Sequence, residues 1–188
     1  MGLSVEIQKK PQYTKNIKLR IPSEVFDLEE VQEIKDAVQE HLLFIGLDRR
    51  NNVRNISLLG VGTSSEINVD AKYVVRTALV NACDRVILVH NHPSNNLEPS
   101  NHDITMTNTM NKLLHVFNIK LLDHVIVNEN DYISMSEIHV IDEDYESDRI
   151  KLLDNALLSE ENSLLKKKLK KLSKVSAKNE KEEEYEIE

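Results

Sequence analysis

The sequence predicts a layered α/β domain, because short apolar runs alternate with segments whose apolar residues recur at helical spacing. The runs 42–48, 85–89 and 119–128 are rich in Leu, Ile and Val, and charged or polar residues bound them. A run that is apolar at nearly every position is typical of a strand that is covered on both faces. We therefore expect a domain with strands between helices over residues 24–138.

The first half of this domain is predicted to contain one helix and a hairpin. Residues 27–42 carry apolar side chains at helical spacing, with Asp27 as the expected N-cap. The residues of that pattern are Leu28, Val31, Ile34, Val38 and Leu42. The run 42–48, the polar turn 49–52 and the run 53–62 then predict two strands joined as a hairpin.

The second half of the domain is predicted to alternate between helices and strands. In chain order, the expected elements are a helix at 70–83, a strand at 85–89, a helix at 100–118, a strand at 119–128 and a last short segment at 131–137. Ahead of the domain, the alternating residues 16–21 predict an edge strand.

Composition limits the partners and the location that we expect. Of the 188 residues, 40% are apolar and 30% are charged, which suits one domain with a core and a strongly solvated part. The net charge of -8 disfavours nucleic acid as the main partner, although it leaves room for a local basic patch. Cys83 is the single cysteine, so an intrachain disulfide is impossible, which suits a reducing interior. No window reaches the ~18 apolar residues of a membrane span, so we expect a soluble, cytoplasmic protein without membrane contact.

The composition changes after residue 138. The remaining segment has no Gly or Pro, and Leu158, Leu165 and Leu172 recur seven residues apart. One interpretation is a short coiled coil that forms a homodimer through the C-terminal helix. The alternative is a single solvated helix that frays into disorder. The predicted organisation has three parts: an N-terminal extension at 1–23, the α/β domain at 24–138, and a charged, helical and partly disordered tail at 139–188.

Two histidines follow the predicted strand 85–89. His90 and His92 are two residues apart, so in an extended chain their imidazoles point to the same side and can converge on one ion. Pro93 then forces a turn, and Ser100 and Asp103 have the spacing of a helix start. Two His and one Asp would suit zinc with its fourth position open to water, as in catalytic sites. The alternative is a strand that ends in a loop and a well-capped helix without metal.

A zinc site that activates water also needs a general base. Glu40 is a candidate, because it lies where the first predicted helix meets the first predicted buried strand. From there its carboxylate could lie beside the end of a neighbouring strand.

The stretch HNHPSNNLEPSNHDI resembles the metal-binding signature H-x-H-P-x(6)-S-x-x-D of the JAMM (MPN/JAB) metalloprotease superfamily. With EHLLFIGLD upstream and LLDHVIV downstream, the chain is similar to the RadC-like JAB-domain family over about residues 25–137. RadC proteins often carry an N-terminal helix-hairpin-helix domain, which has no counterpart here, so the chain resembles the shorter form.

The resemblance implies a fold and a set of roles. The fold is a three-layer α-β-α domain with a mixed, curved sheet, similar to cytidine deaminases. His90, His92 and Asp103 match the zinc ligands, and Glu40 matches the acid that activates the water. Ser100 matches the serine that stabilises the developing oxyanion. The implied reaction is attack of water on a peptide or isopeptide carbonyl, so the implied partner is a peptide or protein substrate.

Other polar residues near the signature have two interpretations each. His124 could orient a ligand through a hydrogen bond, or it could be a structural histidine. Asn95 stands where RadC relatives usually have Gly, and we expect it to adopt a left-handed backbone with only a modest local change. His102 is expected to be exposed, and Cys83 to be a small buried residue rather than a ligand.

Two rival functions follow from other features. RadC-like proteins have long been associated with DNA repair, so a DNA-repair-associated or nucleic-acid-processing accessory protein is one alternative. The other alternative is a catalytically silent, metal-bound scaffold that dimerises through the tail.

Overall fold

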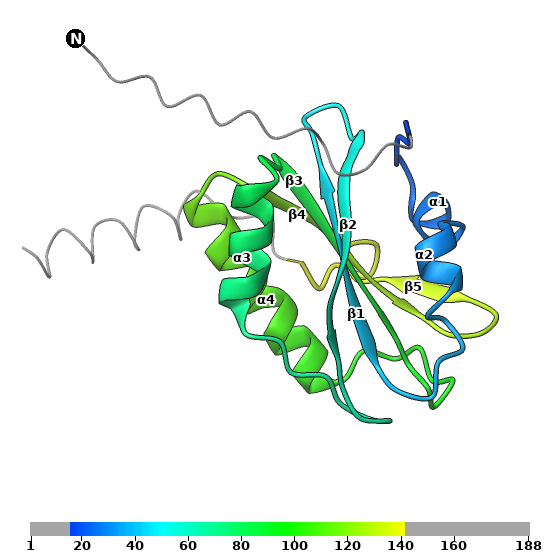
Figure 1. The fold of residues 1–188 in the computed structure, drawn as a ribbon. Helices are drawn as coiled ribbons and strands as arrows, with labels where there is room; N and C mark the ends of the chain where they lie inside the picture. The colour runs from blue at the N-terminus through cyan, green and yellow to red at the C-terminus, as the bar shows by residue number, and fades with distance from the viewer. Residues whose placement is uncertain (1–15, 142–188) are drawn as a thin grey trace, which may run out of the picture. The chain divides into compact units, whose positions relative to one another are not determined.

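The computed structural model describes residues 16–141 (Figure 1). In chain order, its elements are α1 (Pro22–Phe26), α2 (Glu29–Gln32), β1 (His41–Leu47), β2 (Val53–Val61), α3 (Ala71–Val80), β3 (Arg85–Asn91), α4 (Asn101–Val116), β4 (Lys120–Val127) and β5 (Tyr132–Ser134).

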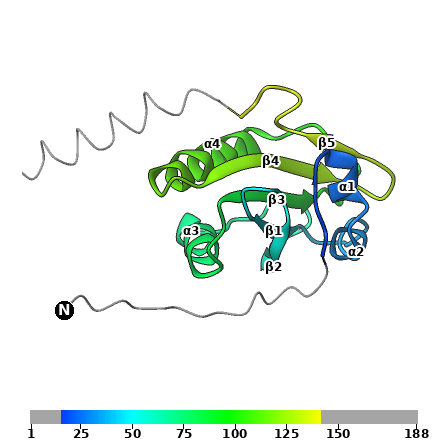
Figure 2. The ribbon, with the colours of Figure 1, turned by 90° about the horizontal axis from the view of Figure 1, so that it is seen from above.

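The five strands form one open sheet in the order β2-β1-β3-β4-β5. β3 and β4 are parallel and are connected through α4, whereas every other neighbouring pair is antiparallel. Helices α3 and α4 cover one face of this sheet, and α1 and α2 lie on the other (Figures 1 and 2). The predicted three-layer α/β fold with a mixed sheet is therefore confirmed.

The central strands explain why the sequence shows apolar runs without alternation. Alternate residues of β1 and β3 face opposite helical layers, so both sides of each strand are buried. The cluster under α3 and α4 includes Leu42, Phe44, Val86 and Leu88. The cluster under α1 and α2 includes Leu43, Ile45, Ile87 and Val89. The predicted strands 42–48, 53–62, 85–89 and 119–128 are confirmed as β1 to β4, and the predicted helices 70–83 and 100–118 as α3 and α4.

The single helix predicted at 27–42 is wrong. Two short helices, α1 and α2, replace it, and Asp27 ends α1 rather than capping a longer helix. Leu28, Val31 and Ile34 are buried against the sheet, which accounts for the helical spacing. The pattern ends there, since Val38 is 81% exposed and Leu42 belongs to β1.

The residues between α2 and β1 leave the helical layer and join the sheet. The Glu40 amide donates to the Thr63 carbonyl at 2.7 Å, and the Glu40 carbonyl accepts from the Gly62 amide at 2.7 Å. These bonds continue the pairing with β2, so the backbone at this point is extended and cannot remain helical. Apolar spacing alone does not reveal this change of partner.

The edge strand predicted at 16–21 is reduced to an isolated bridge between Lys18 and Asn52. Leu19 is nonetheless buried, and its amide donates to the Asn51 carbonyl at 3.0 Å. Pro22 then begins α1, which ends the extended stretch.

The predicted coiled coil and the disordered end of the tail lie outside residues 16–141, as does most of the predicted extension at 1–23. Val140 and Ile141, at the end of the described chain, pack with the core under α3 and α4. Within the described part, no helix is both long and apolar enough to cross a membrane.

Candidate metal centre

Strand β3 places both histidines on the same face of the sheet. It continues to Asn91, and His90 pairs with Leu42 of β1 and with Ile126 of β4. Because alternate residues share a face, His90 and the following His92 both point toward the layer of α3 and α4. Both are buried, with 0% and 8% of their surface exposed.

Helix α4 supplies the carboxylate from its first turn. Ser100 is the N-cap, and its hydroxyl oxygen accepts a hydrogen bond from the Asp103 amide at 3.1 Å. In return, Asp103 Oδ2 accepts from the Ser100 amide at 2.8 Å and from the Ser100 hydroxyl at 2.6 Å. This capping box confirms Ser100 and Asp103 as the start of the helix, and it fixes the direction of the Asp103 carboxylate.

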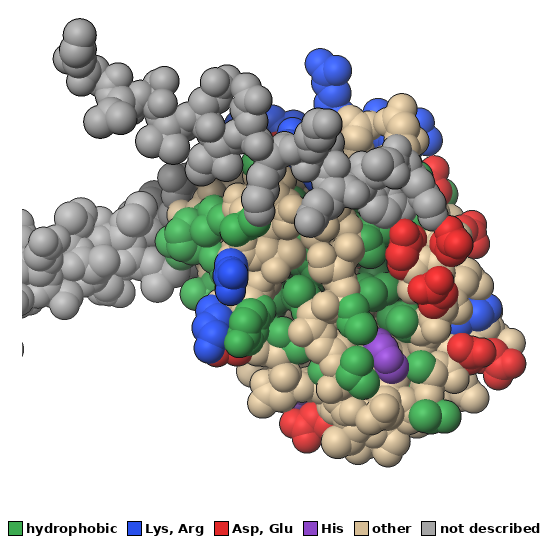
Figure 3. Space-filling model, viewed as in Figure 1, with side chains coloured by type: hydrophobic (Ala, Val, Ile, Leu, Met, Phe, Trp, Pro, Cys, Tyr) green, Lys and Arg blue, Asp and Glu red, His purple; other side chains and the backbone are tan. Residues whose placement is uncertain are grey.

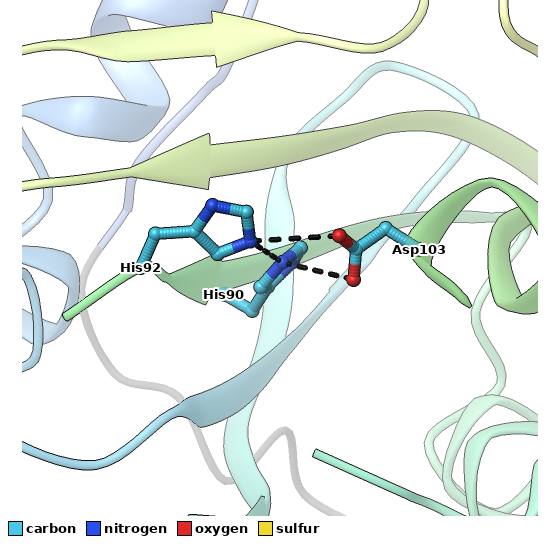
Figure 4. Close-up of side chains that lie close together, drawn as sticks. All are labelled: His90, His92 and Asp103. Atoms are coloured by element: carbon cyan, nitrogen blue, oxygen red, sulfur yellow. Dashed lines mark hydrogen bonds and ion pairs between the residues drawn. The ribbon is translucent and has the colours of Figure 1, made fainter. Parts of the chain in front are cut away.

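The three side chains converge (Figure 4). The two Nε2 atoms of His90 and His92 are 2.9 Å apart. The distance from His90 Nε2 to Asp103 Oδ1 is 3.3 Å, and that from His92 Nε2 to Asp103 Oδ2 is 3.5 Å. Ligands of a tetrahedral zinc with bonds of about 2.0–2.1 Å lie about 3.3 Å from one another. The donor set and its spacing therefore fit a metal ion, and within residues 16–141 no other His, Cys, Asp or Glu group has this arrangement.

A chain of hydrogen bonds determines the tautomer of His90. The Thr107 hydroxyl donates to the Asp103 carbonyl at 2.6 Å, so its oxygen accepts from His124 Nδ1 at 2.6 Å. His124 Nε2 is then an acceptor, and the N–H of His90 Nδ1 donates a hydrogen bond to it at 2.8 Å. The remaining nitrogen, His90 Nε2, keeps its lone pair for the metal position.

His92 is oriented by the loop that follows it. Its Nδ1 lies 2.6 Å from the Asn96 carbonyl, which can only accept, so Nδ1 carries the proton and Nε2 is free to bind. Asn95 makes this turn with a positive φ of 62°, and its amide donates to the His92 carbonyl at 3.0 Å. The expectation that Asn95 takes the left-handed backbone is confirmed.

Glu40 lies beside these ligands. The antiparallel β1–β3 register ends at the pair of Leu42 and His90, and Glu40 and His92 lie two residues beyond that pair. The charges of His92 and Asp103 both act on the Glu40 carboxyl, which places it near them. Glu40 lies two residues before Leu42, which packs under α3 and α4, so in an extended chain its carboxylate faces the same layer. Glu40 is only 6% exposed although it belongs to no regular element.

Comparison with known proteins shows the family of this chain. The sequence model of the RadC-like JAB domain matches residues 19–140. This chain belongs to the RadC-like JAB domain family. Its relatives include a UPF0758 protein of Chlorobaculum tepidum, 31% identical over 134 residues, which are 70% of this chain and 60% of that protein. A UPF0758 protein of Finegoldia magna is 37% identical over 103 residues, which are 55% of this chain and 46% of that protein. The aligned part thus spans about 60% or less of the length of these relatives.

In this RadC-like JAB domain, the pKa values of the candidate ligands are shifted in different directions. Burial acts to raise the pKa of Asp103, but the contacts with His90 and His92 outweigh it and hold that pKa well below its usual range. Burial lowers the pKa of His90 and, more strongly, that of His124. Burial also acts to lower the pKa of His92, but Asp103 and the Asn96 carbonyl raise it above its usual value. The site is therefore an anionic carboxylate facing imidazoles of which His92 is the most basic.

The Glu40 carboxyl has the opposite shift to Asp103. Burial is the main cause that raises its pKa, and the negative charges of Asp103 and Glu66 add to this effect. The imidazoles of His92 and His102 oppose it. A carboxyl with a raised pKa holds a proton more readily, which is a property of general bases and acids.

Three other predicted residues are placed as follows. Ser100 is exposed and touches Asp103, so it lies at the rim of the group. His102 is exposed as expected, and its Nε2 lies 3.1 Å from the Ile67 carbonyl. Cys83 is buried in the core under α3 and α4, where burial raises the pKa of its thiol to about 11, and it is not among the grouped ligands.

Sequence reasoning missed Thr107, Asn96 and Asn91. Thr107 has a recognisable signal, because it lies four residues after Asp103 and therefore on the same helix face. Asn96 acts through its carbonyl oxygen, which no residue type reveals. Asn91 lies between His90 and His92 with 0% exposure, but the predicted strand ended at residue 89, so its place inside the sheet was not expected.

Proposed function

We propose that this RadC-like JAB domain is a zinc-dependent hydrolase of the JAMM type that cleaves a peptide or isopeptide bond. The observation that carries this proposal is the buried group of His90, His92 and Asp103, with the separate and buried carboxyl of Glu40 close enough to interact with it. Three protein ligands leave one zinc position for water or substrate, whereas purely structural sites have four. Zinc in such a site would act as a Lewis acid, which lowers the pKa of a bound water and polarises a carbonyl.

Glu40 is proposed as the general base. Its carboxylate takes a proton from the attacking water as the water oxygen bonds to the carbonyl carbon. The same proton then passes to the leaving nitrogen as the carbon–nitrogen bond breaks, which keeps the proton balance of hydrolysis. Burial raises the pKa of Glu40, so its conjugate acid forms more easily than that of an exposed carboxyl.

The ligand side chains are proposed to act with fixed protons. The bond from His90 Nδ1 to His124 and the bond from His92 Nδ1 to the Asn96 carbonyl leave both Nε2 lone pairs free. His124 is therefore proposed to orient a ligand rather than to be a structural histidine only. The low pKa of Asp103 keeps its carboxylate anionic, as a metal ligand must be.

Ser100 is proposed to stabilise the negative charge that develops on the substrate carbonyl oxygen. It is exposed and lies next to Asp103, so a substrate could reach its hydroxyl. The hydroxyl proton now bonds to Asp103 Oδ2, and it would have to turn toward the substrate for this role.

The test compares zinc content and hydrolysis in three variants of the full chain. The wild type should bind about one zinc, His92→Ala should lose most of it, and the control His102→Ala should keep it. Glu40→Gln should keep the zinc and lose hydrolysis of a panel of peptides and isopeptide-linked conjugates by about a hundredfold or more. Full zinc in His92→Ala would contradict the ligand assignment. Zinc binding without any hydrolysis in the wild type would favour the silent scaffold.

Surface charge disfavours the DNA-related alternative. Acidic side chains gather on the side of α1 and α2 (Figure 3). Exposed among them are Asp27, Glu29, Glu33 and Asp36. Such a face repels phosphates. Binding to DNA near physiological salt, with affinity that falls steeply as salt rises, would favour this alternative over hydrolysis.

A further inference from the structure

Asn91 lies between the two histidine ligands and points away from them. Alternation along β3 turns its side chain to the face opposite His90 and His92. It has 0% exposure, and its amide reaches the residues between α2 and β1. There, Nδ2 donates to the Ala37 carbonyl at 3.1 Å and to the Gln39 carbonyl at 3.0 Å.

The amide oxygen of Asn91 completes the contact. Oδ1 accepts a hydrogen bond from the His41 amide at 2.7 Å. The two bonded neighbours, Gln39 and His41, flank Glu40 on both sides. Glu40 itself is bonded through its own amide and carbonyl to Thr63 and Gly62. The backbone at Glu40 is thus held on one side by Gly62 and Thr63, which follow β2, and on the other by the Asn91 side chain of β3.

The segment 37–41 needs this residue type. It presents two carbonyls that accept and one amide that donates toward the same point, and only a carboxamide offers donors and an acceptor together. A carboxylate would face the two carbonyls without a proton, and an apolar residue would leave three buried polar groups without partners. Asn91 therefore bonds to polar backbone groups that no pairing between β1 and β3 satisfies, because residues 37–40 precede β1 and the register between these strands begins at Leu42.

We infer that Asn91 is a positioning residue for the general base: its carboxamide fixes the backbone of residues 37–41 and so sets the place of the Glu40 carboxylate relative to the metal ligands. The inference rests on the proposed function, in which Glu40 is the base. Since Asn91 directly joins His90 and His92 in the chain, the three consecutive residues 90–92 determine the positions of two proposed ligands and of the proposed base. Removing the carboxamide should displace the base without removing the metal.

The test uses the full chain loaded with cobalt(II), a tetrahedral substitute for zinc whose absorption spectrum changes with its ligands and their surroundings. Wild type is compared with Asn91→Ala, Glu40→Gln and the double variant. Asn55→Ala is the matched control, because Asn55 is a buried asparagine of β2 whose Nδ2 bonds to the Ser57 hydroxyl at 2.7 Å. Amide hydrogen exchange of residues 39–41 is the second measurement, and it does not depend on the metal.

In Asn91→Ala we expect one cobalt per chain, as in the wild type. The His41 amide should exchange about tenfold faster or more, because it loses its acceptor. The cobalt spectrum should move toward that of Glu40→Gln, and the double variant should match Glu40→Gln alone. Asn55→Ala should leave both measurements unchanged. If Asn91→Ala fails to fold, Asn91→Ser keeps one hydroxyl and should shift both measurements in the same directions by less.

Two results would overturn the inference. One is unchanged exchange at residues 39–41 in the Asn91 variants. The other is faster exchange with a wild-type spectrum while Glu40→Gln changes the spectrum, because Asn91 would then hold the backbone without placing the base. Failure of the proposed function gives a different result: Glu40→Gln itself would have the wild-type spectrum, and the base assignment would fall together with the inference that rests on it.

Discussion

The two parts of the candidate site are built in different ways. The candidate ligands His90, His92 and Asp103 lie at the end of a strand and in the first turn of a helix, where regular geometry sets their directions. Glu40 lies on the irregular residues 37–40 before β1, which side-chain and backbone hydrogen bonds hold in place. Regular elements make the spacing of the ligands visible in the sequence, whereas the place of the base depends on distant partners.

The difference teaches that the metal position and the base can be disturbed separately. The candidate ligands depend on the Ser100 cap and on Thr107 of α4, and on His124 of the neighbouring β4. The base part depends on bonds between β3 and residues about fifty positions earlier, such as the bond between His41 and Asn91. Variants that affect only one part test whether this division is real.

The largest effect is expected where the proton of His90 is fixed. His124→Ala should weaken zinc binding by about 10- to 100-fold, because the residue that accepts from His90 Nδ1 is lost. Thr107→Val should weaken it in the same direction but less, since His124 remains without its partner hydroxyl. Competition with a chelator measures both affinities.

Thr109→Val is the matched control for this series. Thr109 is also in α4, and its hydroxyl donates to the Thr105 carbonyl at 2.8 Å, but it is exposed. It should keep the wild-type affinity within about twofold. Equal affinities in Thr107→Val and Thr109→Val would show that the hydrogen-bond chain does not orient His90.

The next effect concerns pH. The pKa of His92 is raised above its usual value of about 6.5, and only the neutral imidazole binds zinc. Affinity should therefore be constant at higher pH and fall as the pH decreases through that raised pKa, by up to about tenfold per pH unit for one displaced proton. The pKa of His90 is lowered, so its protonation should contribute only at more acidic pH.

Zinc affinity measured by chelator competition between about pH 5.5 and 8 checks this expectation. His102→Ala should show the same curve, because that residue is not among the ligands. A flat curve over the whole interval would contradict the shift assigned to His92.

Part of the fold and of the candidate site could be predicted from the sequence. The group of His90, His92 and Asp103 that could hold a metal ion was predictable, because residues two apart on a strand and three apart at a helix N-terminus have fixed directions. The central strands followed from apolar runs. The helix predicted at 27–42 was wrong, because the spacing of Leu28, Val31 and Ile34 also suits short helices that pack on a sheet.

The hydrogen bonds between Asn91 and the residues around Glu40 could not be predicted, for a physical reason. Asn91 bonds to backbone atoms of residues 50 to 54 positions earlier, and backbone atoms are the same for every residue type. No spacing rule connects an asparagine on a strand to a turn that follows a helix. Such a contact becomes visible only when both segments are placed in the fold.

The smallest effect is expected at the helix cap. Ser100→Ala should lower the free energy of unfolding by about 1 kcal/mol, because the Asp103 amide loses its acceptor, and it should weaken zinc binding as the carboxylate loses its orientation. Asp70→Ala removes the N-cap of α3, which accepts from the Lys72 amide at 2.9 Å. It should cost a similar free energy and leave zinc binding unchanged.

Urea denaturation of the metal-free protein and chelator competition measure the two quantities. Unchanged zinc affinity in Ser100→Ala would show that the capping box starts the helix without orienting the ligand.

The central claim is that one ion is held by the three ligands and that Glu40 stands beside its fourth position. A crystal structure of the zinc-loaded protein tests it most directly. We expect zinc on His90 Nε2, His92 Nε2 and an oxygen of Asp103, with the Glu40 carboxylate within hydrogen-bond distance of a water at the fourth position. Zinc with a fourth protein ligand, or a Glu40 carboxylate turned away from that position, would contradict the claim.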